Sequence, residues 1–157
     1  MSHERRAVSF LLFRRRSLAW RRSLRSFLRR LPAKARRLDE HISPDVADGL
    51  RRRSRSLVIH WMAEWEGGDF LGKEDSASLL EAAKQGLTLV TYDRRTIPPL
   101  LKTWAEEEQR HGGVIFVDEK TISPADIGGL VRALIELSKE TGKWDWADRV
   151  YFLRRQR

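Results

Sequence analysis

Short apolar runs alternate along this chain with longer segments whose apolar residues recur at a helical period. The clearest runs cover residues 87–92 (LTLVTY) and 114–117 (VIFV), and a segment of helical period separates them. Strands that alternate with helices in this way are typical of α/β domains with a mostly parallel sheet. The sequence therefore predicts a small three-layer α/β sandwich.

Capping and turn residues divide the chain into the expected elements. Ser43 and Pro44 have the residue types favoured at the N-cap and first position of a helix, and Ser123 and Pro124 repeat this pair. Gly86 is expected to end a helix in a left-handed conformation. The expected helices cover residues 44–53, 76–85, 98–110 and a segment that begins at Ser123 and Pro124. The expected strands cover a short segment before Asp39 and residues 56–62, 87–92, 114–117 and 149–153.

Basic residues are concentrated near the amino end. Residues 1–37 hold 13 of the 31 Lys and Arg and one of the 22 Asp and Glu, a net charge of +12, whereas the other 120 residues hold 18 basic and 21 acidic residues, a net charge of −3. Apolar residues at helical spacing up to Leu31 predict a basic amphipathic helix. This helix suits an anionic lipid surface or nucleic-acid phosphates, and the plainer alternatives are a solvated tail or translated upstream sequence. We expect an extension over residues 1–37 and a domain over residues 38–157.

The chain contains no cysteine, which excludes disulfides, a thiol nucleophile and zinc sites built on thiolates. This composition favours a reducing cytoplasmic location. The apolar run at residues 8–13 is short and is followed by Arg14, so neither a secretory signal nor a membrane span is expected. The two common glycine-rich phosphate-binding motifs are absent from the sequence.

Acidic residues follow several of the expected strands. Asp39 and Glu40 come after the first strand and Asp93 after the third, while Asp75 lies at a helix start beyond the second. The carboxyl ends of parallel strands share one edge of a sheet, so these acids are expected to lie close together. Carboxylates that approach one another repel unless a cation lies between them, and oxygen ligands favour Mg²⁺ or Mn²⁺.

Each of these residues also has a structural interpretation. Asp75 is equally consistent with a helix cap, and Asp93 with an ordinary Asx turn. Glu40 suits a solvated loop. The arginine run at residues 51–55 suits a solvated helix end, or it attracts a phosphodiester toward the acidic edge.

Five segments, in order, carry a resemblance to a known family. They are LDEHISP at residues 38–44, Asp75 ahead of SLLEAA at 78–83, LVTYDR at 89–94, GVIFV at 113–117 and WADRVYFL at 146–153. Over about residues 38–153 the chain resembles the small bacterial PIN-like proteins that are related to VapC-type toxin ribonucleases.

The resemblance implies a PIN-like sandwich that hydrolyses RNA phosphodiesters with Mg²⁺ or Mn²⁺. Asp39, Asp75 and Asp93 match the metal-binding and catalytic acids, and Thr91 and Glu40 are the expected supporting residues, with the Thr91 hydroxyl bonded to Asp93 or to the attacking water. The resemblance also implies the toxin half of a toxin–antitoxin pair, a small antitoxin partner and a homodimer. The candidate RNA-binding residues are Arg51, Arg52, Arg53, Arg94 and Arg95.

Two other functions are consistent with the sequence. Residues 94–96 read Arg-Arg-Thr where many PIN sequences carry a further Asp, which favours a catalytically inactive PIN-like module that binds RNA or protein. A receiver-like signalling domain also has acids after its first and third strands, but the lysine expected after its fifth strand has no clear counterpart here.

Overall fold

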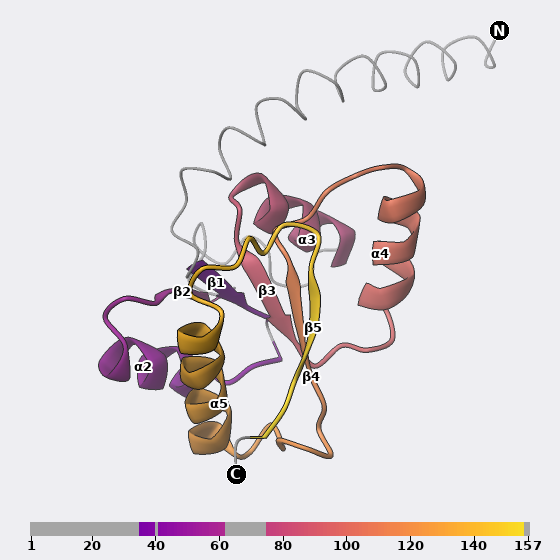
Figure 1. Cartoon of the computed structure of the whole chain (residues 1–157). Helices are drawn as coiled ribbons and strands as arrows, with labels where there is room; N and C mark the ends of the chain where they lie inside the picture. The colour runs from indigo at the N-terminus through magenta and orange to yellow at the C-terminus, as the bar shows by residue number, and fades with distance from the viewer. Residues whose placement is uncertain (1–34, 40, 62–74, 156–157) are drawn as a thin grey trace, which may run out of the picture. The chain divides into compact units, whose positions relative to one another are not determined.

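The computed structural model describes residues 35–39, 41–61 and 75–155, with residues 75–78 described by their backbone alone. All of them belong to one compact unit, residues 32–157. The predicted amphipathic helix up to Leu31, Glu40 and residues 62–74 lie outside the described residues. Figure 1 shows the elements, which are β1 (Ala35–Leu38), α2 (Pro44–Arg53), β2 (Val58–Trp61), α3 (Asp75–Lys84), β3 (Thr88–Thr91), α4 (Ile97–Glu106), β4 (Val114–Val117), α5 (Ile127–Glu140) and β5 (Val150–Leu153).

The five strands form one sheet in the order β2-β1-β3-β4-β5, and every strand pair is parallel. Leu38 of β1 lies opposite Val90 of β3, and Val90 lies opposite Ile115 of β4. The predicted α/β fold with a parallel sheet is confirmed. Because all strands run the same way, the residues that follow them collect at one carboxyl edge.

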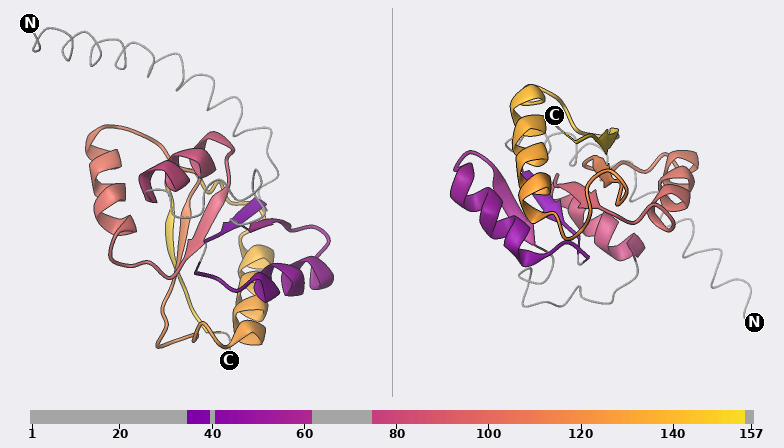
Figure 2. Two further views of the ribbon diagram at one scale, coloured as in Figure 1. Left: turned by 180° about the vertical axis from the view of Figure 1, so that it is seen from behind. Right: turned by 90° about the horizontal axis from the view of Figure 1, so that it is seen from below.

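Helices cover both faces of the sheet, as the two views of Figure 2 show. Helices α2 and α5 pack together on one face, where Leu50 and Leu134 join the larger core cluster. Helices α3 and α4 contribute Leu79 and Trp104 to a second cluster on the other face. The result is the predicted three-layer sandwich, in which each helix buries one apolar stripe against the sheet.

The capping residues account for the start of α2 but not for the start of α5. As predicted, Pro44 is the first residue of α2, and the Ser43 hydroxyl accepts a hydrogen bond from the Asp45 amide at 3.3 Å. The prediction that Ser123 and Pro124 begin a helix is wrong by a few residues. The Ser123 hydroxyl caps a turn through the Ala125 amide at 3.3 Å, and α5 begins only at Ile127, capped by Asp126.

Two glycines lie in turns where any other residue type would be strained. Gly86 ends α3 with a φ of 64°, as predicted for a left-handed helix terminus. Gly113 has a φ of 97°, and a Cβ at that position would lie 2.5 Å from the Trp146 carbonyl oxygen. This close approach allows the chain after α5 to pack against the beginning of β4.

Strand β1 is fully buried although half of its residues are arginines. It includes residues 35–37, which the sequence analysis placed in the basic extension. The Arg36 guanidinium lies 4.6 Å from the ring centroid of Trp146, and desolvation lowers its pKa to about 10. Arg37, on the opposite face of the strand, adds to the lowering of the Glu81 pKa, for which the Gln85 hydrogen bond is the main cause. Stacking on Trp146 thus accompanies the burial of Arg36, and electrostatic attraction to Glu81 accompanies that of Arg37.

Candidate functional site

The candidate site lies at the carboxyl edge, where β1 and β3 are neighbours. In the sheet, β2 lies on one side of β1 and β3 lies on the other. The chain therefore changes direction across the sheet at β1 and β3, and these two strands form its topological switch point. Ligands of open parallel sheets bind outside the strand ends at such points. Asp39 follows β1 directly, and its amide donates a 3.0 Å hydrogen bond to the Val90 carbonyl.

Thr91 connects the two aspartates of this edge. Its hydroxyl donates to Asp39 Oδ2 at 2.6 Å and accepts a hydrogen bond from the Asp93 amide at 2.9 Å. Thr91 is completely buried, so its side chain has few alternative positions. We expected this hydroxyl to bond to the Asp93 carboxylate or to a water, but its side-chain partner is Asp39 because the register places Thr91 beside residue 39.

The Asp39 side chain lies near the surface of the site. It is 13% exposed, and His41 Nδ1 lies 3.7 Å from Asp39 Oδ2. The carboxylate is therefore fixed by Thr91 on its buried side while it still has contact with solvent. A ligand at the sheet edge can reach such a group without rearrangement of the core.

The Asp93 carboxylate organises the loop that leads into α4. Its Oδ1 accepts hydrogen bonds from the amides of Arg95 and Thr96, both at 2.8 Å, and its Oδ2 accepts one from the Thr96 hydroxyl. Burial opposes ionisation of Asp93, but these hydrogen bonds outweigh it and lower its pKa. The Asx-turn role considered from the sequence is therefore present in the structure.

This arrangement limits how Asp93 can bind a further ligand. A carboxylate offers about four acceptor positions. The hydrogen bonds described above occupy both positions of Oδ1 and one of Oδ2. Asp93 thus retains about one position, on Oδ2, which suits a single bond to a cation.

The remaining candidate acids are described less completely. Asp75 is the first residue of α3, but its side chain is not among the described ones, and Glu40 is outside the described residues. Among the described side chains, no group of three Asp, Glu or His residues could hold a metal ion. The structure therefore brings Asp39 and Asp93 to one edge and does not determine the position of the third carboxylate.

The arginines divide into two groups. Arg51, Arg52 and Arg53 form the last turn of α2, which begins at the carboxyl edge and runs back along the sheet, so the structure does not bring them to the aspartates. Arg51 instead donates to the Ile59 carbonyl at 3.2 Å. Arg94 and Arg95 directly follow Asp93 and are exposed at the correct edge.

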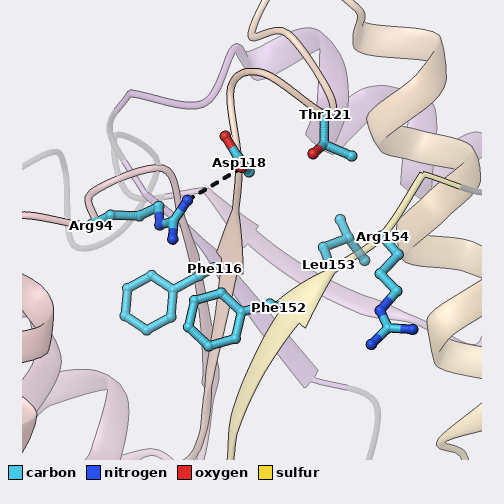
Figure 3. A pocket seen from close by; sticks show the side chains of 7 residues that line it. All are labelled: Arg94, Phe116, Asp118, Thr121, Phe152, Leu153 and Arg154. Carbon is cyan, nitrogen blue, oxygen red and sulfur yellow. Dashed lines mark ion pairs between the residues drawn. The ribbon is translucent and has the colours of Figure 1, made fainter.

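A cleft of about 290 Å³ lies beside this edge, next to the ends of β4 and β5. Figure 3 shows Arg94 and Asp118 facing each other above the rings of Phe116 and Phe152. The Arg94 and Asp118 side chains form an ion pair at 3.3 Å. Phe152, which is 56% exposed, was not predicted from the sequence, because the apolar run around it does not show which face of the strand a helix covers. The full lining is Arg94, Phe116, Asp118, Thr121, Phe152, Leu153 and Arg154.

In the described part of the chain, none of the helices is both long and apolar enough to cross a bilayer. Comparison of the chain with models of protein families, with curated proteins and with solved structures finds no match.

Proposed function

We propose that this chain is a metal-dependent endoribonuclease with a PIN-like fold. The observation that carries the proposal is the connection of Asp39 to Asp93 through Thr91 at the switch point of a parallel sheet. Carboxylates at this position offer oxygen donors at the place where such sheets bind ligands. The resemblance over residues 38–153 supplies the reaction, which is hydrolysis of an RNA phosphodiester.

The donor chemistry of the site fits Mg²⁺ or Mn²⁺. Both ions prefer oxygen ligands, and Mg²⁺ keeps several waters while it binds to one or two carboxylates. Asp39 has partial solvent exposure, and Asp93 has about one acceptor position left on Oδ2. In this proposal Asp39, Asp93 and Asp75 hold the ion, while Glu40, the next residue after Asp39, supports them.

The residues of the chain have separate tasks in the proposed reaction. Thr91 fixes the Asp39 carboxylate by donating a hydrogen bond from its hydroxyl to Oδ2. The amides of Arg95 and Thr96 keep Asp93 ionised, because their hydrogen bonds favour the charged form. A bound divalent ion supplies a water of lowered pKa and neutralises charge on the leaving oxygen. Arg94 and Arg95 offer positive charge to the phosphates beside the acids.

The cellular setting of the proposal follows from the resemblance. The protein would act in the cytoplasm as the toxin of a toxin–antitoxin pair, be suppressed by a small antitoxin protein and form homodimers. Expression of the chain should then slow bacterial growth, and the Asp39→Asn variant should not. Equal growth with both chains would contradict the toxin role.

RNA cleavage tests the proposed activity. Wild-type protein with Mg²⁺ or Mn²⁺ should cut single-stranded or structured RNA, and EDTA should stop the reaction. Asp39→Asn should abolish cleavage while circular dichroism shows an unchanged fold. Asp48→Asn is the matched control, because Asp48 is an exposed acid on α2 whose partner is Arg51. The proposal fails if wild-type protein leaves RNA intact with Mg²⁺ and also with Mn²⁺, or if the two variants cleave RNA equally.

An inactive PIN-like module that binds RNA or protein is the second candidate. It is favoured by the commitment of the Asp93 carboxylate to the start of α4, since three hydrogen bonds already occupy it. Such a module would retain RNA in a gel-shift experiment, with and without EDTA, and would yield no cleavage products.

A further inference from the structure

The exposed ring of Phe152 is the least explained apolar group at the carboxyl edge. Phe152 is 56% exposed although it belongs to the sheet, because β5 is the last strand on its side. Its ring stacks with that of Phe116 on β4, with centroids 5.5 Å apart and an interplanar angle of 23°. Phe116 is itself buried. The Phe152 ring is thus supported by Phe116, and more than half of the side chain remains exposed at the surface.

One arginine lies over this ring and a second lines the same cleft. The Arg94 guanidinium lies 5.6 Å from the ring centroid and is positioned by its ion pair with Asp118. Arg154 lines the same cleft and lies on the other side of the end of β5 in Figure 3. The cleft therefore has two arginines and one acid, and its net charge attracts an anion. An aromatic platform beside cations is the arrangement with which proteins bind single-stranded nucleic acid.

The size of the apolar surface argues against a second copy of the chain as the occupant. Val150 and Phe152 are the large hydrophobic residues that β5 exposes. A stable protein interface needs about 800 Å² from each partner, whereas a whole aromatic side chain buries about 150–250 Å². Two partly exposed side chains flanked by arginines match the dimensions of one base and its phosphates far better.

We propose that this cleft binds an unpaired nucleotide of single-stranded RNA, with the base stacked on Phe152 and the adjoining phosphates near Arg94 and Arg154. The inference rests on the proposed function, because it names the substrate contact that would place RNA at the same edge. Arg94 directly follows Asp93, and β5 is two strand spacings from β3, about 10 Å. An RNA chain whose base is held at Phe152 can therefore reach the aspartates.

Binding of a fluorescent RNA in EDTA tests this cleft separately from any cleavage. The probe is a single-stranded RNA oligonucleotide that contains 2-aminopurine, whose fluorescence falls when the base stacks on an aromatic ring. Full-length wild-type protein should quench the probe, and Phe152→Ala should bind it about tenfold more weakly and lose the quenching. Phe152→Trp should keep both. The same sequence as a duplex should not be quenched.

Two further variants sharpen the test. Val150→Ala is the matched control, since Val150 is the other exposed apolar residue of β5, and it should bind the probe like wild type. Arg154→Gln should reduce the slope of log affinity against log salt by about one. Apart from this salt series, the measurements are made at raised salt, so that long-range attraction to other basic segments contributes less.

The outcomes distinguish this inference from the proposed function. Unchanged binding and quenching in Phe152→Ala would overturn the proposal that this cleft binds RNA. A wild-type dimer that becomes monomeric in Phe152→Ala, with no change in RNA binding, would assign the edge to a second copy and also overturn it. If quenching depends on Phe152 but wild-type protein never cleaves RNA, the nuclease proposal fails while the cleft stands.

Discussion

The Thr91 hydroxyl donates a 2.6 Å hydrogen bond to the carboxylate of Asp39, which lies 52 residues earlier in the sequence. This bond joins the ends of β1 and β3 and fixes the acid on which the proposed chemistry depends. Because Thr91 also accepts from the Asp93 amide, one buried hydroxyl sets the positions of both aspartates.

Replacement of Thr91 by Val should separate this positioning from the fold. Valine has nearly the same shape but leaves Asp39 and the Asp93 amide without the hydroxyl, which should cost about 1–3 kcal/mol in the free energy of unfolding. Any RNA cleavage should fall about 10–100-fold, as expected when a ligand-orienting group is lost. Urea denaturation and cleavage assays measure the two effects. Thr91→Ser keeps the hydroxyl and should retain most of both. Equal losses in the two variants would contradict the hydrogen-bond argument.

Asp93 should show a structural role that is separable from its proposed metal role. Asp93→Ala removes the acceptor for two amides at the start of α4, and it should lower the free energy of unfolding by about 1–2 kcal/mol. Asp93→Asn keeps an acceptor oxygen and should retain most of the stability while it abolishes cleavage. Denaturation midpoints together with cleavage rates test this division. A stable, active Asp93→Asn variant would show that the carboxylate charge is not needed.

The pH dependence of stability should reveal His111. This side chain is buried, and its Nδ1 accepts a hydrogen bond from the Gly113 amide at 3.1 Å, which requires an unprotonated nitrogen. Desolvation lowers the His111 pKa, and the opposing attraction of Asp148 does not reverse this. The unfolded chain therefore binds the proton more readily, so stability is complete above about pH 6.5 and falls as the pH decreases toward the lowered value.

Thermal unfolding measured between about pH 4 and pH 8 tests this effect, because that range brackets the ordinary His pKa of about 6.5. His111→Asn should flatten the loss of stability below pH 6.5. Identical slopes for wild type and His111→Asn would show that His111 does not carry the dependence.

The buried arginines of β1 lead to a further prediction. Arg36 is buried, and desolvation lowers its pKa to about 10, so its charge opposes folding at neutral pH. Replacement of buried charges by apolar residues of similar volume is often neutral or stabilising by about 1–4 kcal/mol. Arg36→Met should therefore keep or increase the free energy of unfolding measured in urea. A loss of more than about 2 kcal/mol would show that the stacking on Trp146 outweighs desolvation.

The sequence was sufficient where local patterns decide the structure. The run at residues 114–117 is apolar throughout and is buried throughout in β4, and the Ser43-Pro44 pair marks the start of α2. Local patterns failed at α5, because Asp126 lies closer to the helix than Ser123 and takes the cap.

The site required information that a single sequence does not contain. Asp39 and Asp93 were expected at one edge because parallel strand ends meet there, but the partner of Thr91 depends on the register of β1 against β3. Hydropathy could not predict that Arg36 and Arg37 are buried, since their surroundings are formed by distant residues. The position of Arg51–Arg53 away from the acids was predictable, because a helix that follows a strand runs back along it.

Binding of Mn²⁺ followed by electron paramagnetic resonance tests the central claim most directly. Free Mn²⁺ gives a strong signal that is lost when the ion binds to the protein, so a titration counts the sites without any need for RNA. Wild-type protein should bind one or two ions, and Asp39→Asn should bind fewer and more weakly while Asp48→Asn matches wild type. The account is contradicted if wild-type protein binds no ion, or if Asp39→Asn binds Mn²⁺ as wild type does.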